Sequence, residues 1–357
     1  MILRRMFIAA ITGLVLTPIS ALAADKLNVV ATTGMIADTA ARVGGDAVEV
    51  VGLMGAGVDP HGYRQTRSDI VAMTRADVVL WNGLFLEAQM EAFFMTLSER
   101  QPVIAVTDKI EAGARDGTGT PLIDSPDYEG TYDPHIWMDM EIWTQVVDRI
   151  AEAFSDLRPD QSELFAANAK AINDELLALK AFGADALAQI PADARVLITA
   201  HDAFSYFGDA YGMDVMGVQG ISTESEAGLH RIRELVDLLV ARKVEAVFVE
   251  SSVSDRNIKA LVEGAAAQGQ IVRLGGELFS DAMGPEGTYQ GTYIGMMDHN
   301  ITTIARALGA DDVPSAGFNG QLQGGSKTDV STCPCSTQAR RVDSRSVVRA
   351  GHDGVLR

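Results

Sequence analysis

The chain has 357 residues, of which 47% are hydrophobic and 22% are charged, and its formal net charge is −19. Such acidity repels nucleic acid and anionic lipid and attracts cations, although acidity that serves solubility alone explains the charge equally well. The length exceeds what one hydrophobic core usually serves, so we expect two domains.

The first 23 residues have the pattern of a secretory signal peptide. Arg4 and Arg5 precede an apolar run from Met6 to Ile19, and a small-x-small cleavage site ends at Ala23. The apolar run is shorter than the roughly 20 residues of a membrane span. We therefore expect cleavage near Ala23 and a free periplasmic protein, because no cysteine lies near that site to accept a lipid.

Residues 24–157 alternate β-rich and helical segments, which predicts an α/β lobe around a four-stranded parallel sheet. The predicted strands lie in the segments LNVVATTG, AVEVVGLM, VVLWNG and PVIAVT. Helices are expected at about 68–74, where Ser68 and Asp69 favour an N-cap, and at 86–97. The loop at 111–132 is rich in Gly, Pro and Asp, and its length indicates a functional or mobile segment.

One long helix is expected between the lobes, within residues 158–189. Apolar residues recur at helical spacing from Pro159 to Leu187, and proline is favoured in the first turn of a helix. At about 1.5 Å per residue this helix would be roughly 40 Å long, with only Gly183 as an interruption. We interpret it as a stiff connector.

Residues 190–325 repeat the alternation, which predicts a second α/β lobe with a four-stranded parallel sheet. Its strands are expected in RVLITA, DVMGVQ, AVFVES and IVRLGG, and a helix from about Tyr289 to Leu308 closes the lobe. The segment 326–357 has no clear period and few large apolar residues, so we expect it to be disordered or loosely attached. It holds the only two cysteines, Cys333 and Cys335.

Four potential metal ligands follow predicted strands. His61, His135 and His201 come after the second, fourth and fifth strands, and Asp281 comes after the eighth. Open α/β sheets bind ligands past the carboxyl ends of their strands, so two candidates in each lobe would face one cleft. Three imidazoles and one carboxylate are a competent ligand set for zinc or a neighbouring divalent metal. A single histidine is more often structural than a metal ligand. The position of three of the six histidines after predicted strands nevertheless favours a metal site.

His61 and His135 share a preceding Asp-Pro pair. Proline restricts the backbone, so each histidine leaves its loop in a limited direction. Asp59 and Asp133 either accept the second ring N–H of their histidine or form only an Asx turn with the loop backbone. We expect Glu250, at the end of a strand, to form a salt bridge or support a ligand instead of binding metal.

Enzyme motifs are mostly missing. The chain has no His-Glu-x-x-His, no Gly-x-Ser-x-Gly and no phosphate loop of the Walker type. A zinc hydrolase remains an alternative, although Asp281 would fill the open position that such an enzyme needs. His230 and His299 are interpreted as ordinary helical residues, and Glu224 is expected at a helix N-terminus.

Seven segments carry a resemblance to a known family: GAGVDPHGYRQTRSDI, ADVVLWNGLFLE, DPHIWMD, AHDAFSYFGDAYGM, VQGISTESEAGL, FVESSVSDRNIKAL and LFSDAMGPEGTY. With them the chain resembles, from about Leu27 to Leu322, the metal-binding proteins that deliver zinc or manganese to ABC importers. The resemblance implies two α/β lobes joined by a long rigid helix, with the metal between them. The family's ligand positions fall on the residues selected above: His61, His135, His201 and Asp281.

The chain departs from the family pattern in three places. Gln65-Thr66-Arg67 stands where many members have Pro-Thr-Pro, the 111–132 segment lacks the His-rich loop of many zinc-specific members, and the 326–357 segment extends past the usual ending. Manganese-selective members commonly place Glu where His201 stands. Three nitrogens with one carboxylate favour zinc, which also outranks manganese in intrinsic affinity.

We therefore expect a periplasmic substrate-binding protein, not an enzyme, that captures one divalent metal ion and delivers it to an ABC permease on the inner membrane. Zinc is favoured over manganese. The protein is expected to be a monomer without a nucleic-acid partner, and a periplasmic metallochaperone is a further candidate partner. A zinc-dependent hydrolase at the same site and a metal-stabilised adhesin are the alternatives. Because a long helix resists hinge opening, metal release is expected through loop movement near His61, His135 or 111–132.

Overall fold

The computed structural model describes residues 25–110, 122–125, 130–225 and 227–322. The predicted signal peptide, most of the 111–132 loop and the 326–357 segment with both cysteines lie outside the described residues. Within the described ranges, no helix has both the length and the apolar composition that crossing a bilayer requires.

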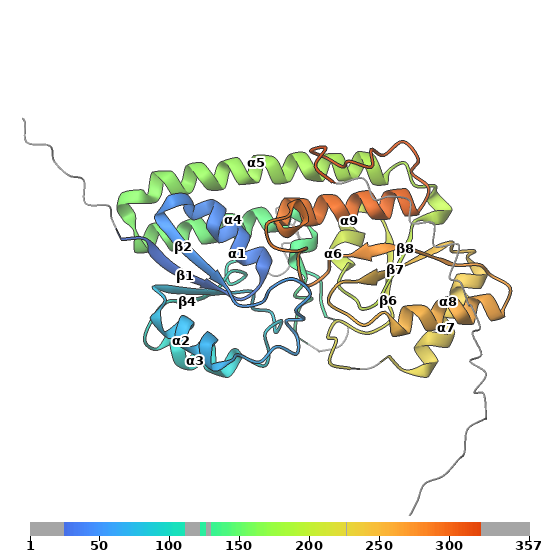
Figure 1. Cartoon of the computed structure of the whole chain (residues 1–357), viewed down its shortest axis with the longest axis horizontal. Coiled ribbons are helices and arrows are strands. Elements are labelled where there is room, and N and C mark those ends of the chain that lie inside the picture. Colours follow the sequence, from blue (N-terminus) through green and yellow to red (C-terminus); the bar gives the residue numbers. More distant parts are fainter. Residues whose placement is uncertain (1–24, 111–121, 126–129, 226, 323–357) are drawn as a thin grey trace, which may run out of the picture. The chain divides into compact units, whose positions relative to one another are not determined.

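A parallel sheet forms the centre of the N-terminal lobe (Figure 1). Its strands run in the order β2-β1-β3-β4 and are β1 (Leu27–Ala31), β2 (Val48–Gly52), β3 (Val78–Trp81) and β4 (Val103–Ala105). All three pairings are parallel, so the carboxyl ends of the four strands lie at one edge of the sheet. The four strands predicted for this lobe are confirmed.

Helices cover both faces of this sheet, and they are α1 (Gly34–Gly44), α2 (Arg67–Arg75), α3 (Glu91–Ser98) and α4 (Met140–Leu157). Helices α1 and α4 lie on one face, and α2 and α3 lie on the other (Figure 1). Val29 of β1 packs in the core cluster of the first face, whereas Val30 packs with Met73 and Phe94 on the second. Successive strand residues point to opposite faces, and both faces are covered, which explains why the last three residues of β1 are all apolar and buried.

The start of α2 differs from the prediction. Thr66 caps this helix, because its Oγ1 accepts the Asp69 N–H at 3.3 Å while the Asp69 carboxylate accepts the Thr66 N–H at 2.7 Å. This reciprocal capping box satisfies two backbone donors and replaces the cap that was expected at Ser68. The helix therefore begins at Arg67.

The segment before α3 is a tight turn instead of the first helical turn predicted from residue 86. Leu84 and Phe85 have φ angles of 54° and 64°, in the left-handed region that non-glycine residues rarely adopt. The buried Glu87 carboxylate supports this turn by accepting the Asn82 N–H at 2.8 Å. Burial raises the pKa of Glu87 to about 7. Helix α3 begins only at Glu91.

The second lobe contains the four predicted strands, but they form two parallel pairs instead of one four-stranded sheet. The pairs are β5 (Val196–Thr199) with β6 (Asp214–Gly217), and β7 (Ala246–Glu250) with β8 (Arg273–Leu278). Strands β5 and β7 are neighbours whose side chains share one apolar cluster, so packing takes the place of a hydrogen-bonded ladder between them. The helices of this lobe are α6 (Ser205–Tyr211), α7 (Leu229–Ala241), α8 (Arg256–Ala267) and α9 (Tyr293–Ala307).

The predicted long helix is α5 (Ser162–Leu187), which follows a 3-10 turn at Pro159–Gln161. Its 26 residues span about 39 Å and run along both lobes (Figure 1). It packs on α1 and α4 of the first lobe and on α6 and α9 of the second. Gly183 does not interrupt the helix but permits this packing, because a Cβ there would lie 2.9 Å from both Tyr211 Oη and Ile301 Cδ1.

Candidate metal centre

Loops from both lobes bring four side chains together past the carboxyl ends of strands. His61 follows β2, His135 follows β4, His201 follows β5 and Asp281 follows β8. One potential ligand atom from each residue lies within 4.8 Å of all the others. The structure thus assembles all four predicted candidates from segments that are far apart in the sequence.

The ligand atoms are spaced as donors around a single ion would be. His61 Nε2 lies 3.3 Å from His135 Nε2, which lies 3.4 Å from Asp281 Oδ1. His201 Nε2 is 3.2 Å from Asp281 Oδ2, and His61 Nε2 is 3.9 Å from the same oxygen. Donors at about 2.0–2.2 Å around a tetrahedral ion would be about 3.3–3.6 Å apart. Three of these distances lie at or near that range, and the fourth, between His61 Nε2 and Asp281 Oδ2 at 3.9 Å, is longer.

The centre is buried, and three of its polar atoms have no hydrogen-bond partner in the part of the chain that the structure describes. The exposed fractions are 4% for His61, 2% for Asp281 and 0% for His135 and His201. Among the described residues, His201 Nε2 and both carboxylate oxygens of Asp281 lack a hydrogen-bond partner. Burying such atoms unsatisfied is costly, and a cation between them would satisfy all three.

Asp133 supports His135 through both of the contacts predicted as alternatives. Its Oδ1 accepts the backbone N–H of His135 at 2.9 Å, which forms the Asx turn, and lies 2.7 Å from the ring Nδ1. A proton on Nδ1 donated to the carboxylate leaves the lone pair on Nε2, the nitrogen that faces the centre.

Glu250 supports His201 in the same way, as expected. Its Oε2 lies 2.6 Å from the ring Nδ1, and its Oε1 accepts the backbone N–H of His201 at 2.9 Å. The end of β7 therefore orients a side chain that follows β5.

Asp59 forms only the Asx turn and does not contact the imidazole ring in the way that Asp133 does. Its Oδ1 accepts the backbone N–H of His61 at 2.9 Å, and its Oδ2 accepts a hydrogen bond from the Thr223 hydroxyl of the second lobe. The two Asp-Pro-His triplets thus form the same Asx turn, but only Asp133 also lies within hydrogen-bond distance of the ring of its histidine.

Burial and neighbouring charges act in opposite directions on these groups. Burial lowers the pKa of His61 to about 3. Burial also acts to lower the pKa of His135, but Asp133 and Asp281 outweigh it and raise that pKa to about 9. Burial acts to raise the pKa of Asp281, yet His201 and His135 hold it well below its usual range. The neighbouring imidazoles therefore favour the charged form of this carboxylate.

Three buried carboxylates surround or support the centre, those of Asp133, Glu250 and Asp281. Within the described ranges their ion-pair partners are histidines, with no lysine or arginine among them. Buried negative charge without a permanent counter-charge is costly. A divalent cation would supply the positive charge without requiring protonated imidazoles.

Sequence reasoning missed the contacts that tie the loops of the centre together. Trp137 Nε1 donates to the Ser280 carbonyl oxygen at 2.8 Å, which joins the segments that carry the second and fourth candidate ligands. Asn82 Nδ2 donates to the Pro134 carbonyl oxygen at 3.1 Å. No sequence pattern marks these residues, because each side chain binds a backbone group that is distant in the chain.

Comparison with known proteins finds relatives that are named for metal binding. Residues 29–307 match the family described as the periplasmic zinc-uptake complex component A, ZnuA. The manganese-binding lipoprotein MntA of Bacillus subtilis is 46% identical over 285 residues, which are 80% of this chain and 90% of MntA. The zinc-binding protein TroA of Treponema pallidum is 42% identical over 287 residues, with coverage of 80% and 90%.

Two further matches extend the comparison. The manganese ABC transporter substrate-binding lipoprotein PsaA of Streptococcus pneumoniae is 31% identical over 80% of this chain and 90% of its own length. The solved structure of periplasmic TroA superposes with a TM-score of 0.75, at 41% identity, over 80% of this chain and 99% of that one. Members of the family serve transport and are not enzymes, so the hydrolase alternative is set aside. This chain belongs to the ZnuA family of metal-binding, substrate-binding proteins of ABC importers.

Proposed function

We propose that this chain captures one divalent transition-metal ion with His61, His135, His201 and Asp281, with zinc favoured over manganese, and presents it to an ABC permease. One observation carries the proposal: three imidazole Nε2 atoms and one carboxylate meet within 4.8 Å, almost without exposure to solvent. All four donors come from one chain, so a monomer suffices.

The choice of zinc rests on the donor atoms, because relatives do not decide it. MntA is named for manganese and TroA for zinc, and this chain is more than 40% identical to both. Imidazole nitrogen suits zinc, whereas manganese prefers carboxylate and other oxygen donors. The carboxylates behind His135 and His201 make those nitrogens stronger donors, which supports the same choice.

The proposal places the protein in the periplasm, with residues 1–23 as a cleaved signal peptide. The segment around Ala23 holds no cysteine that could take a lipid, although relatives such as MntA are named lipoproteins. The proposed organisation is one lobe at 24–157 and one at 190–325, joined by the helical segment 158–189.

The proposal is tested by metal analysis of protein purified without added metal, followed by competition between zinc and manganese. We expect one zinc ion per chain, and we expect zinc to displace manganese at equal concentration. His201→Ala should weaken zinc binding by about 100-fold or more, since it removes one of four ligands. His230→Ala, on the exposed face of α7, is the matched control and should bind as the wild type does.

Two results would contradict the proposal. Unchanged zinc affinity in a folded His201→Ala variant would remove this residue from the ligand set. Manganese retained against equimolar zinc would overturn the choice of metal while leaving the site itself intact.

A further inference from the structure

The loop between β6 and α7 crosses from the second lobe to the first. Glu224 was expected at the N-terminus of a helix, but α7 begins only at Leu229, so Glu224 lies in this loop. Its carboxylate accepts hydrogen bonds from Gln89 Nε2 of the first lobe, at 3.1 and 3.3 Å. We call residues 219–225 the mouth loop.

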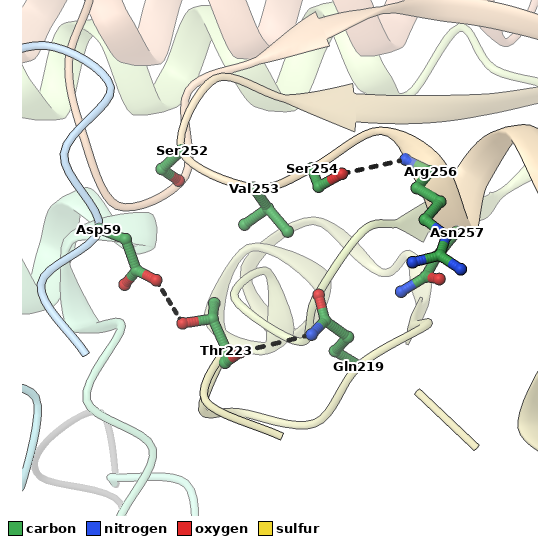
Figure 2. A pocket seen from close by; sticks show the side chains of 8 residues that line it. All are labelled: Asp59, Gln219, Thr223, Ser252, Val253, Ser254, Arg256 and Asn257. Carbon is green, nitrogen blue, oxygen red and sulfur yellow. Dashed lines mark hydrogen bonds between the residues drawn. The ribbon is translucent and has the colours of Figure 1, made fainter. Parts of the chain in front are cut away.

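A second contact between the lobes is the hydrogen bond from Thr223 Oγ1 to Asp59 Oδ2 (Figure 2). The other oxygen of the same carboxylate accepts the backbone N–H of His61 at 2.9 Å. One carboxylate of the first lobe thus holds a proposed metal ligand with one oxygen and the mouth loop with the other.

Gln219 orders the mouth loop for this contact. Its Nε2 donates to the carbonyl oxygens of Ser225 at 2.9 Å and Thr223 at 3.4 Å, the second of which is drawn in Figure 2. These bonds fix the backbone on either side of Glu224, so less conformational entropy is lost when the Thr223 hydroxyl meets Asp59.

The mouth loop also lines the cavity that reaches the metal centre. This cavity has a volume of about 260 Å³ and is lined by His61 together with Ile221, Ser222 and Glu224 of the loop. Leu84 and Phe85, whose φ angles are positive, line it from the first lobe. His61 is also the most exposed of the four proposed ligands, at 4%. This cavity therefore reaches the proposed ligand His61 beside the mouth loop.

We propose that Asp59 is a positioning residue that couples His61 to the mouth loop, and that breaking the Thr223–Asp59 hydrogen bond opens the route for metal exchange. This inference rests on the proposed function and adds the place where the metal passes. The two atoms of this contact, Thr223 Oγ1 and Asp59 Oδ2, are not proposed metal ligands, so we expect the contact to hold the mouth loop against the first lobe similarly with and without metal. Its loss should therefore speed uptake and release alike and leave the equilibrium affinity nearly unchanged.

The test compares Thr223→Val, which removes the hydroxyl at constant size, with Thr223→Ser, which retains it. Zinc release into an excess of chelator and zinc uptake are followed by stopped flow, and Co²⁺ serves as a spectroscopic probe of the ligand set. We expect both rates to rise about tenfold in Thr223→Val, as the loss of one hydrogen bond to a charged group predicts. Thr223→Ser should restore them, and the Co²⁺ spectrum should be that of the wild type in both.

Thr74→Val is the matched control, because Thr74 is exposed and its hydroxyl donates to backbone carbonyl groups of its own helix, α2. Its exchange rates should equal those of the wild type. In an Asp59→Ala background, Thr223→Val should cause no further change, since its partner is already gone.

The outcomes separate this inference from the proposed function. Wild-type rates in Thr223→Val, or failure of Thr223→Ser to restore them, would overturn the role of this hydrogen bond while metal binding stands. An altered Co²⁺ spectrum in Thr223→Val would show that Thr223 shapes the ligand set and would overturn the exchange route. A wild-type protein that binds no metal would overturn both proposals.

Discussion

Carboxylates that hold histidines give the candidate metal centre its geometry. Asp133 and Glu250 each bind the backbone N–H and the ring Nδ1 of a histidine, so both the position and the ring orientation are fixed. Asp59 fixes only the backbone of His61. The ring of His61 is therefore less constrained than the other two, at the side of the centre where the cavity reaches it.

We predict that Glu250→Gln weakens zinc binding by about 10- to 100-fold. The amide keeps one acceptor oxygen but loses the negative charge that makes His201 a stronger metal ligand. Its NH₂ group would also lie opposite either the backbone N–H or the ring Nδ1–H of His201, and neither of these can accept a hydrogen bond. Affinity is measured by competition with a zinc-binding dye.

Glu263→Gln provides the control, since this glutamate is exposed on α8. Equal affinities of the two variants would mean that Glu250 contributes only to folding.

The sequence predicted these residues unequally. The four proposed ligands could be found because parallel strands end at one edge of a sheet and because imidazoles are few. For Asp59 and Asp133 the sequence left open whether each carboxylate contacts the histidine ring or forms only an Asx turn. The two residues differ in this respect, although both precede Pro-His. The difference depends on where each ring points, which is set by packing between the lobes.

Helix α5 is the element that most constrains motion. It packs on α1 and α4 at one end and on α6 and α9 at the other, so a wide rotation of the lobes would break contacts on both sides. The close approach at Gly183 places Tyr211 and Ile301 directly against the helix. Metal exchange is therefore expected to need a local change and not a hinge motion.

Small-angle X-ray scattering tests this expectation. The curves of metal-free and zinc-loaded protein should superimpose, because opening of the mouth loop moves few residues. The control is an Asp281→Ala variant, which lacks one proposed ligand. Its curves with and without zinc show how much added zinc changes the scattering when the site is impaired. A large increase in radius of gyration on metal removal would mean that α5 permits rotation after all.

The elements themselves were predicted better than their boundaries and pairing. All eight strands of the described residues were found, because their apolar runs are largely buried and bounded by turn residues. The start of α2 was missed because the capping box of Thr66 and Asp69 competes with Ser68 for the same role. The pairing of the second lobe was missed because packing between β5 and β7 replaces a ladder, which no strand pattern reveals.

At the scale of the whole molecule, the excess of acid groups over basic ones suits a protein that gathers cations. Negative charge is also present in the interior, where the carboxylates of the centre form ion pairs with histidines. Metal and protons therefore compete for the same site, and the stability of the metal-free protein should depend on pH.

We predict that the metal-free protein loses stability as the pH rises from about 7 to 9.5. The pKa of His135 is about 9 in the folded chain against 6.5 for a free histidine, so its contribution is complete below pH 6.5 and is lost as the pH rises through 9. The loss should be on the order of 1–3 kcal/mol, measured by urea unfolding. The raised pKa of Glu87, about 7, acts mainly between pH 4.5 and 7 and so falls below this window.

Zinc-loaded protein is the internal comparison. Its stability should change little over the same range, because the metal and not a proton occupies the Nε2 atoms of the ligands. A parallel decline in both forms would place the titrating group outside the centre.

The sequence alone determined the class of this protein, its eight strands, the long connecting helix and the four residues that meet at the centre. These features depend on local apolar patterns and on the rule that ligands bind at strand ends, both of which are readable along one chain. Only the tertiary structure decided which carboxylate supports which histidine, how the strands of the second lobe pair, and that Thr223 bonds to Asp59 across the lobes. Each of these depends on distances between segments far apart in the sequence, which packing sets and no local pattern records.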